Sequence, residues 1–496
     1  MIDLTPERIK EVCGASLLAG APGRISSEDM PRRAAVDSRA LRRGDLFVGI
    51  LGERTDGGQF AERAVEAGAW GVLVRPEHGL RVAGSAGRLR VFAAEDPLAA
   101  LGRLARAWVD RLWTEGCKVV GVTGSTGKTS TKDILHALLS PTFRHAVHAS
   151  PANYNTEVGL PLAVLGAEIG TSVLVLEMAM RGPDQIRELC RIAPPEIGVI
   201  TNVGPVHLES LGTLEAVAEA KAELIAALPP DGICVVPAVA EALRPHLRRE
   251  VRTLTFAHWP GDEDRSEQAE RVADGTADVR VLRAEPARVG DFDGLRAEIA
   301  VAAERATFEF NFRQAHNLVN ALAAIAAGHA LGVPTEGLVE GARRVAFSEL
   351  RGEEIELSGG AVVINDCYNA NPMSMRAALD HLAEVAARRQ AKRVVAVLGE
   401  MAELGPSAPE FHRAVGRQAA ERGVALLVTV GESGAAYLDG YGGGGDARQV
   451  ADAEQAAALA CELIGPGDVV LVKGSRSVRL ERVTERLREH DAEDGR

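Results

Sequence analysis

The apolar positions of this chain fall into short β-branched runs separated by longer stretches with helical spacing. Three such runs stand at 119–122, 172–178 and 197–202, and a helical pattern follows each of them, one beginning near Leu214. An alternation of strand and helix is typical of a mostly parallel sheet covered by helices. The middle of the chain is therefore predicted to be a parallel α/β unit.

The same alternation, in weaker form, occurs on both sides of this unit. We predict an α/β protein of three domains: a small N-terminal α/β domain over 1–115, a central domain with a P-loop-type sheet over 116–345, and a C-terminal Rossmann-like domain over 346–496. A length of 496 residues agrees with three domains of about 150 residues each. Residues 258–295 are charged, and we predict a surface hairpin or insertion there.

Composition excludes several classes of protein. The net charge of −13 argues against general nucleic-acid binding. Six dispersed cysteines without a CxxC pair predict reduced thiols. No apolar run approaches the roughly 18 residues that a membrane span needs. We therefore expect a cytoplasmic protein without membrane insertion.

The chemistry is predicted to centre on the turn that follows the 119–122 run. Glycines let the backbone wrap an anion, the following helix begins with unpaired N–H groups, and Lys128 adds a full positive charge. Val122 stands where the strict Walker A pattern has glycine, so the loop is a variant, and an ordinary glycine-rich turn is the alternative. The predicted phosphate-binding residues are Gly124, Ser125, Thr126, Gly127, Lys128, Thr129 and Ser130.

Candidate metal ligands follow the next two strands. Glu177 ends one strand and His207 lies in the loop after another, so both can reach a metal beside the phosphates, unless they are unrelated loop residues. Lys221 lies within the apolar stripe of the next helix, where a solvated lysine is unexpected. The alternative is a surface pair with Glu219 or Glu223.

Further polar groups stand at helix starts and strand ends. Asn317 and Asn320 are three residues apart on one helix, where their amides could contact an adenine or merely cap the helix. Asp366, Asn369 and Asn371 follow a strand, at the rim where open α/β sheets bind ligands.

Taken together, these segments resemble the Mur ligases along essentially the whole chain. The resemblance is carried by TGSTGKTS, NYNTEVGLPL, VLEMAMRG, TNVGPVHLESLGT, AHNLVNALAA, DCYNANPMSM, VLGEMAELG and LVKGSRSVRLE. Near the N-terminus, DSR and GERTDGGQF are similar to the UDP-binding domain of this family.

The resemblance implies a monomeric, ATP-dependent ligase of peptidoglycan precursor synthesis. NANPMSM and LGEMAELG look like the branch that joins D-alanyl-D-alanine to UDP-N-acetylmuramoyl-tripeptide through an acyl phosphate, with ATP and two Mg²⁺ ions. The alternative is an enzyme that adds a single amino acid, either the third-residue-adding Mur ligase or a folylpolyglutamate synthase. A rival from another class is a P-loop switch or motor.

The resemblance also implies roles for individual residues. Catalysis would involve Lys128, Lys221, His207 and Glu177, and the metal ligands would be Thr129, Glu177, His207 and a carbamylated Lys221. The nucleotide would contact Asn317, Asn320, Arg351 and Asp366, and the substrates Ser38, Arg39, Asn155, Thr156, Asn369, Asn371 and Lys473. Leu350 departs from the family, which often has glycine before this arginine.

Overall fold

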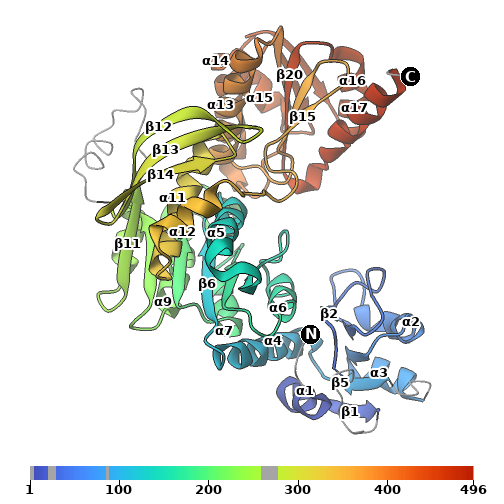
Figure 1. Cartoon of the computed structure of the whole chain (residues 1–496). Helices are drawn as coiled ribbons and strands as arrows, with labels where there is room; N and C mark the ends of the chain where they lie inside the picture. The colour runs from blue at the N-terminus through green and yellow to red at the C-terminus, as the bar shows by residue number, and fades with distance from the viewer. Residues whose placement is uncertain (1–4, 21–29, 85–88, 258–276, 495–496) are drawn as a thin grey trace.

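The computed structural model describes residues 5–20, 30–84, 89–257 and 277–494. In this part of the chain the strands form three separate sheets of five, nine and six strands, each accompanied by helices (Figure 1). The prediction of a mixed, mostly parallel α/β fold is confirmed.

The N-terminal sheet is small, and it is parallel except at one edge. Its order is β1-β5-β4-β3-β2, with β1 antiparallel to β5. The strands are β1 (Ser16–Ala19), β2 (Ala34–Ala35), β3 (Leu46–Val48), β4 (Gly71–Val74) and β5 (Arg90–Ala93). The helices are α1 (Pro6–Cys13), η2 (Gly57–Phe60), α2 (Ala61–Glu66) and α3 (Pro76–Ala83).

Helix α4 (Pro97–Trp113) connects this sheet to the rest of the molecule. Leu101 and Leu104 on α4 belong to the same buried cluster as Ile9 of α1. Trp108, fully buried on α4, donates its indole N–H to the carbonyl of Ala167 at 3.1 Å. One helix therefore packs on both the first and the central part of the chain (Figure 1).

The central sheet has the order β14-β13-β12-β11-β10-β9-β6-β8-β7. Its strands are β6 (Lys118–Thr123), β7 (Val147–Ala149), β8 (Val173–Glu177), β9 (Ile197–Ile200), β10 (Ile233–Pro237), β11 (Arg252–Ala257), β12 (Val279–Val289), β13 (Phe292–Val301) and β14 (Glu304–Phe310). The helices are α5 (Lys128–Phe143), η3 (Arg144–Ala146), α6 (Gly159–Leu165), α7 (Gln185–Ile192), α8 (Leu208–Leu211), α9 (Leu214–Ala227), η4 (Glu241–His246), α11 (Ala315–Ala330) and α12 (Thr335–Ala342).

Strand β6 is apolar on both faces because helices cover both faces of the sheet. Val120 and Val122 pack into one core with residues of α5, α11 and α12. Val119 packs into the opposite core with residues of α4, α6, α7 and α9. A continuous apolar run, rather than an alternating one, is what a doubly covered parallel strand requires.

The predicted surface hairpin or insertion is partly corrected. Residues 258–276 lie outside the described residues. Beyond them, β12 and β13 form a long antiparallel hairpin that continues the central sheet instead of standing apart from it. Its charged positions alternate with buried ones such as Val281 and Ala297, which is the pattern of a sheet with one covered face.

The third sheet has the order β15-β16-β20-β17-β18-β19, and only β15 is antiparallel. Its strands are β15 (Glu353–Glu356), β16 (Val362–Asn365), β17 (Arg393–Gly399), β18 (Leu426–Val430), β19 (Asp446–Val450) and β20 (Asp468–Lys473). The helices are α13 (Pro372–Arg389), η5 (Gly405–Ser407), α14 (Ala408–Glu421), α15 (Gly434–Tyr441), α16 (Ala453–Leu463), η6 (Arg476–Val478) and α17 (Glu481–Asp494).

The six cysteines, all within the described residues, form no disulfide with one another. Among the described helices, none has the length and apolar character that a membrane crossing needs.

Candidate active site

The turn between β6 and α5 has the predicted strand, loop and helix geometry. Gly124 and Gly127 both have positive φ, 150° and 77°. A Cβ at Gly124 would overlap the hydroxyl of Thr201, and one at Gly127 would overlap the side-chain oxygen of Asn320. The loop therefore needs glycine at both positions.

The loop after β9 braces this turn from the side. Asn202 accepts a hydrogen bond from the Thr126 backbone N–H at 2.9 Å and donates its amide to the Thr126 hydroxyl at 2.6 Å. Ser125 donates to the Gly204 carbonyl at 3.0 Å. Since β9 and β8 flank β6 on opposite sides, the turn lies at a topological switch point, where such sheets bind ligands. Sequence reasoning did not single out Asn202.

Glu177 connects the predicted ligands of the central sheet. Its carboxylate accepts from the Thr129 hydroxyl at 2.9 Å and, on the other oxygen, from the Asn155 amide at 2.7 Å. Arg351 donates to the same Thr129 hydroxyl at 3.0 Å and stacks over the ring of Tyr368, 4.0 Å from its centroid. Leu350 before it has a φ of 61°, a conformation that glycine adopts more easily.

Two lysines of the central domain interact electrostatically with each other near the phosphate loop. Lys128 donates to the Gly124 carbonyl at 2.7 Å. Burial lowers its pKa, Glu177 raises it, and Arg351 lowers it further. Lys221 on α9 is 2% exposed, and its pKa is held well below the ordinary value by burial and then by the charge of Lys128. Lys128 is thus the positive group that an anion would meet here, whereas burial favours the neutral amine at Lys221.

The surface pairing that was an alternative for Lys221 is not formed. The carboxylate of Glu223 instead accepts from the backbone N–H groups of Asp184 and Arg187, at 2.5 and 2.9 Å. Glu219 lies on the exposed side of α9. Within the described ranges, no carboxylate or carbonyl oxygen accepts a hydrogen bond from the amine of Lys221.

His207 is engaged by the third part of the chain. Its Nδ1 lies 2.5 Å from Oε2 of Glu403, a residue in the loop after β17. Among the described contacts, none joins His207 directly to Glu177 or Thr129. The segment VLGEMAELG contributes to the family resemblance, but no role was predicted for Glu403 within it. A contact between residues 196 positions apart leaves no local signal in the sequence.

The polar groups of α11 lie against the phosphate loop. Asn317 and Asn320 are both buried, and Asn320 donates to the side-chain oxygen of Asn317 at 3.1 Å. The side-chain oxygen of Asn320 is also the group that faces Gly127. Neither amide caps the helix, whose N-cap residue Gln314 makes no side-chain cap bond.

The third sheet contributes a lysine and a carboxylate at neighbouring strand ends. Lys473 donates to Asp366 Oδ2 at 2.6 Å and to the Asn369 carbonyl at 3.0 Å. Asn371 forms a capping box with Ser374 at the start of α13, so its side chain already has a structural partner.

The described contacts of the remaining predicted substrate residues are local ones. Arg39 is exposed and pairs with Asp37 at 2.8 Å, and Ser38 stands between them in a turn. Thr156 accepts a 3.4 Å bond from the Gly159 N–H and so supports the start of α6.

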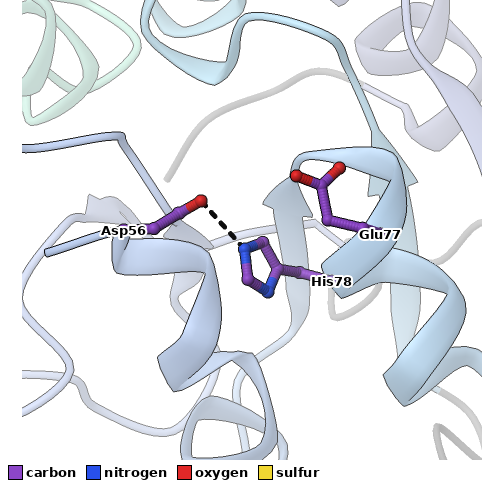
Figure 2. Close-up of side chains that lie close together, drawn as sticks. All are labelled: Asp56, Glu77 and His78. Carbon is purple, nitrogen blue, oxygen red and sulfur yellow. Dashed lines mark hydrogen bonds and ion pairs between the residues drawn. The ribbon is translucent and has the colours of Figure 1, made fainter.

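A second group of titratable residues lies in the N-terminal part. Figure 2 shows Asp56, Glu77 and His78 close together, with a hydrogen bond only between Asp56 and His78, at 2.9 Å. Arg75 already pairs with Asp56 at 3.7 Å and with Glu77 at 3.3 Å. Asp56 also caps η2 through the Gly58 N–H. The guanidinium supplies the positive charge that a metal ion would bring.

Comparison with known proteins agrees with this geometry. Family models match 34–108 (Mur ligase family, catalytic domain), 122–328 (Mur ligase middle domain) and 350–476 (Mur ligase, glutamate ligase domain). UDP-N-acetylmuramoyl-tripeptide--D-alanyl-D-alanine ligase of Mycobacterium bovis is 36% identical over 98% of both chains. The Bacillus subtilis enzyme of the same name is 33% identical over 91% of this chain and 92% of its own.

Solved structures give the same result. A crystal structure of MurF from Acinetobacter baumannii covers 98% of this chain and 99% of its own, at 26% identity and a TM-score of 0.80. MurF ligase from Thermotoga maritima in complex with ADP covers 95% of this chain and 100% of its own, at 28% identity and a TM-score of 0.74. The chain belongs to the Mur ligase family.

Proposed function

We propose that this chain joins D-alanyl-D-alanine to UDP-N-acetylmuramoyl-tripeptide at the expense of ATP, in the synthesis of peptidoglycan precursors. The main observation in support is the phosphate loop, in which Thr129 donates to Glu177 and Lys128 is influenced by the charge of Glu177. In addition, the chain is similar over almost its whole length to proteins named for this activity. The ADP complex of the similar Thermotoga maritima enzyme supports ATP as the phosphoryl donor.

The reaction needs activation because a carboxylate is a poor electrophile. The terminal carboxylate of the tripeptide attacks the γ-phosphorus of ATP, which releases ADP and leaves an acyl phosphate. The amine of D-alanyl-D-alanine then attacks the acyl carbon, the amine proton is lost, and inorganic phosphate departs as the amide forms. Because carboxylate and triphosphate repel one another, the protein must neutralise and align them.

Lys128, the backbone N–H groups of the loop and the N-terminus of α5 would hold the β- and γ-phosphates. The residues around Glu177 also fit magnesium, since a carboxylate and a hydroxyl are the hard oxygen donors that it prefers and Thr129 already touches Glu177. When bound, Mg²⁺ neutralises charge on the transferred phosphoryl group. We assign Thr129 and Glu177 to the first of two ions.

We assign the second ion to Glu177, His207 and a carbamate formed on Lys221. The carbamate forms when the neutral amine attacks CO₂ and loses a proton, which gives an anionic oxygen ligand in place of an ammonium. The support is the setting of the amine: Lys221 is buried, no counter-ion pairs with it in the described structure, and the charge of Lys128 lowers its pKa further.

The other predicted residues are proposed to bind the rest of the two substrates. Asn317, Asn320, Arg351 and Asp366 would contact the nucleotide, and Arg351 and Asn320 already border the phosphate loop. Asn155 is proposed to position the substrate carboxylate beside Glu177. The assigned substrate contacts also include Ser38, Arg39, Thr156, Asn369, Asn371 and Lys473.

We further propose that the three sheets mark three domains, 1–115, 116–345 and 346–496, and that the protein acts as a cytoplasmic monomer. UDP-sugar, ATP and dipeptide would be held by the first, second and third domain respectively. The contacts of Arg351 and Glu403 with the central domain support a reaction at the interface of the last two.

The test is phosphate release from ATP with the tripeptide donor, measured with and without D-alanyl-D-alanine. Release should require donor and dipeptide together, and single amino acids should not replace the dipeptide. Turnover with a single amino acid would favour another Mur-type ligase or a folylpolyglutamate synthase. Release that needs neither donor nor acceptor would favour a P-loop switch.

A further inference from the structure

The contact between His207 and Glu403 is one of the places where the third domain touches the central one. Besides the side-chain contact, the Glu209 N–H donates to the Glu403 carbonyl at 3.2 Å. Arg181 lies 3.5 Å from the other carboxylate oxygen of Glu403. Three groups of the central domain therefore meet this one residue of the third.

The loop that carries Glu403 is held firmly within its own domain. The Met401 N–H donates to His412 at 3.0 Å, and the Ala402 N–H donates to Ser475 at 2.9 Å. Gly405 follows with a φ of 62°, and a Cβ there would stand 3.2 Å from the Cα of Glu209. The Glu403 carboxylate is therefore expected to move together with the whole third domain.

Both partners of the contact have an uncommon backbone conformation. His207 has a φ of 54° and Glu403 a φ of 62°, in the left-handed region that is unfavourable for non-glycine residues. Such strain persists where the surroundings fix it, and it gathers at functional sites. Two strained residues on different domains are here directed at each other.

The chemistry of the pair determines which nitrogen of His207 is free. A carboxylate can only accept a hydrogen bond, so Nδ1 carries the proton and donates to Glu403. In a neutral imidazole the other nitrogen, Nε2, then has a lone pair. A carboxylate behind a ligating histidine fixes its tautomer, orients its ring and raises its basicity.

We propose that Glu403 is a positioning residue that presents Nε2 of His207 to a divalent cation, and that it does so only when the third domain is docked on the central domain. Cation binding at His207 and domain docking then favour each other, as thermodynamic linkage requires. The inference rests on the proposed function, which makes His207 a metal ligand.

The experiment is a titration of the full-length protein with Mn²⁺ in the presence of ADP, with free Mn²⁺ counted by electron paramagnetic resonance. Glu403→Ala should weaken one Mn²⁺ site by about 10- to 100-fold, the usual effect of losing a partner behind a metal ligand. Glu410→Gln, an exposed glutamate of the same domain, is the matched control and should bind as the wild type does.

A double-mutant cycle separates this role from a structural one. His207→Ala should weaken the same site, and adding Glu403→Ala should weaken it no further, because Glu403 acts only through His207. Additive losses, or an unchanged Mn²⁺ affinity in Glu403→Ala while His207→Ala weakens the site, would overturn the inference and leave the ligand assignment intact. An unchanged affinity in His207→Ala would instead contradict the ligand assignment in the proposed function.

Hydrogen exchange gives a readout that does not depend on activity. The Glu209 N–H, bonded to the Glu403 carbonyl, should exchange more slowly when Mn²⁺ and ADP are bound than with ADP alone. This slowing should disappear in His207→Ala, provided that the variant has the same melting temperature as the wild type. Equal slowing in both proteins would contradict the coupling.

Discussion

Lys221 and Lys473 are buried to the same extent, yet their surroundings differ. Each is 2% exposed. The ammonium of Lys473, at the end of β20, is surrounded by oxygens of Asp366 and Asn369 at 2.6, 3.0 and 3.3 Å. Lys221, on α9, has no such oxygen in the described structure, and the positive charge of Lys128 lowers its pKa in addition to burial.

Burial alone therefore does not decide the chemical role of a lysine. A buried charge is tolerated when it is paired and hydrogen-bonded, and it is costly otherwise. Lys473 meets this condition as an ammonium and fixes Asp366. Lys221 does not meet it, so its site favours the neutral amine, which can become a carbamate.

The largest effect is expected at Lys221. Lys221→Ala should abolish ligation, and a small added carboxylate such as formate should restore part of it, because its oxygens can occupy the place of the carbamate. Lys221→Arg should remain inactive, since a fixed positive charge cannot replace an anionic ligand. Steady-state phosphate release measures all three. Full activity of Lys221→Arg would show that a positive charge suffices at position 221, as at position 473, and would contradict the carbamate.

Lys128 extends the comparison to a lysine required as a cation. Lys128→Ala should lower the turnover number by about 10² to 10³, the cost of losing one preorganised partner of developing charge. Carboxylates should not rescue this variant. Normal turnover in a protein with an unchanged circular dichroism spectrum would refute the role.

Replacing each of the two buried lysines by methionine should affect the stability of the protein differently. Lys473→Met should lower the free energy of unfolding by about 3 kcal/mol, because removing one partner leaves Asp366 without its counter-ion. Lys221→Met should leave stability unchanged or raise it, since no partner is abandoned. Scanning calorimetry of the intact chain compares the two. Equal destabilisation would indicate that Lys221 is paired after all.

The smallest expected effect is the change in folding stability with pH that the titration of Lys221 causes. Its folded pKa is depressed by burial, so between that value and the ordinary 10.5 the unfolded chain holds more protons than the folded chain. Stability of the wild type relative to Lys221→Met should therefore rise with pH across this window, by at most about 1.4 kcal/mol per pH unit. Denaturation in carbonate-free buffers measures it. A flat or falling difference would contradict the depressed pKa.

The parts of the site that are local in sequence were predictable. The loop from Gly124 to Ser130 follows from a strand, its glycines and the helix start, and Glu177 follows from its position at a strand end. The buried setting of Lys221 follows from the apolar stripe of α9.

Other parts depend on contacts that no local pattern carries. Glu403 reaches His207 only because two separate sheets pack together, and Arg351 reaches Thr129 across 222 residues. A surface hairpin was predicted for the β12–β13 region, but not that it extends the central sheet, because its charged positions face outward while the alternate positions continue the central core. In each case the tertiary arrangement decides what the local residues do.

The most direct test is ¹³C nuclear magnetic resonance of the full-length protein supplied with ¹³C-labelled bicarbonate, Mg²⁺ and ADP. The account predicts a protein-bound carbamate signal in the wild type and in Lys473→Met, and its loss in Lys221→Met. A wild type without any bound label, or a signal that persists unchanged in Lys221→Met, would contradict the assignment of a carbamate to Lys221.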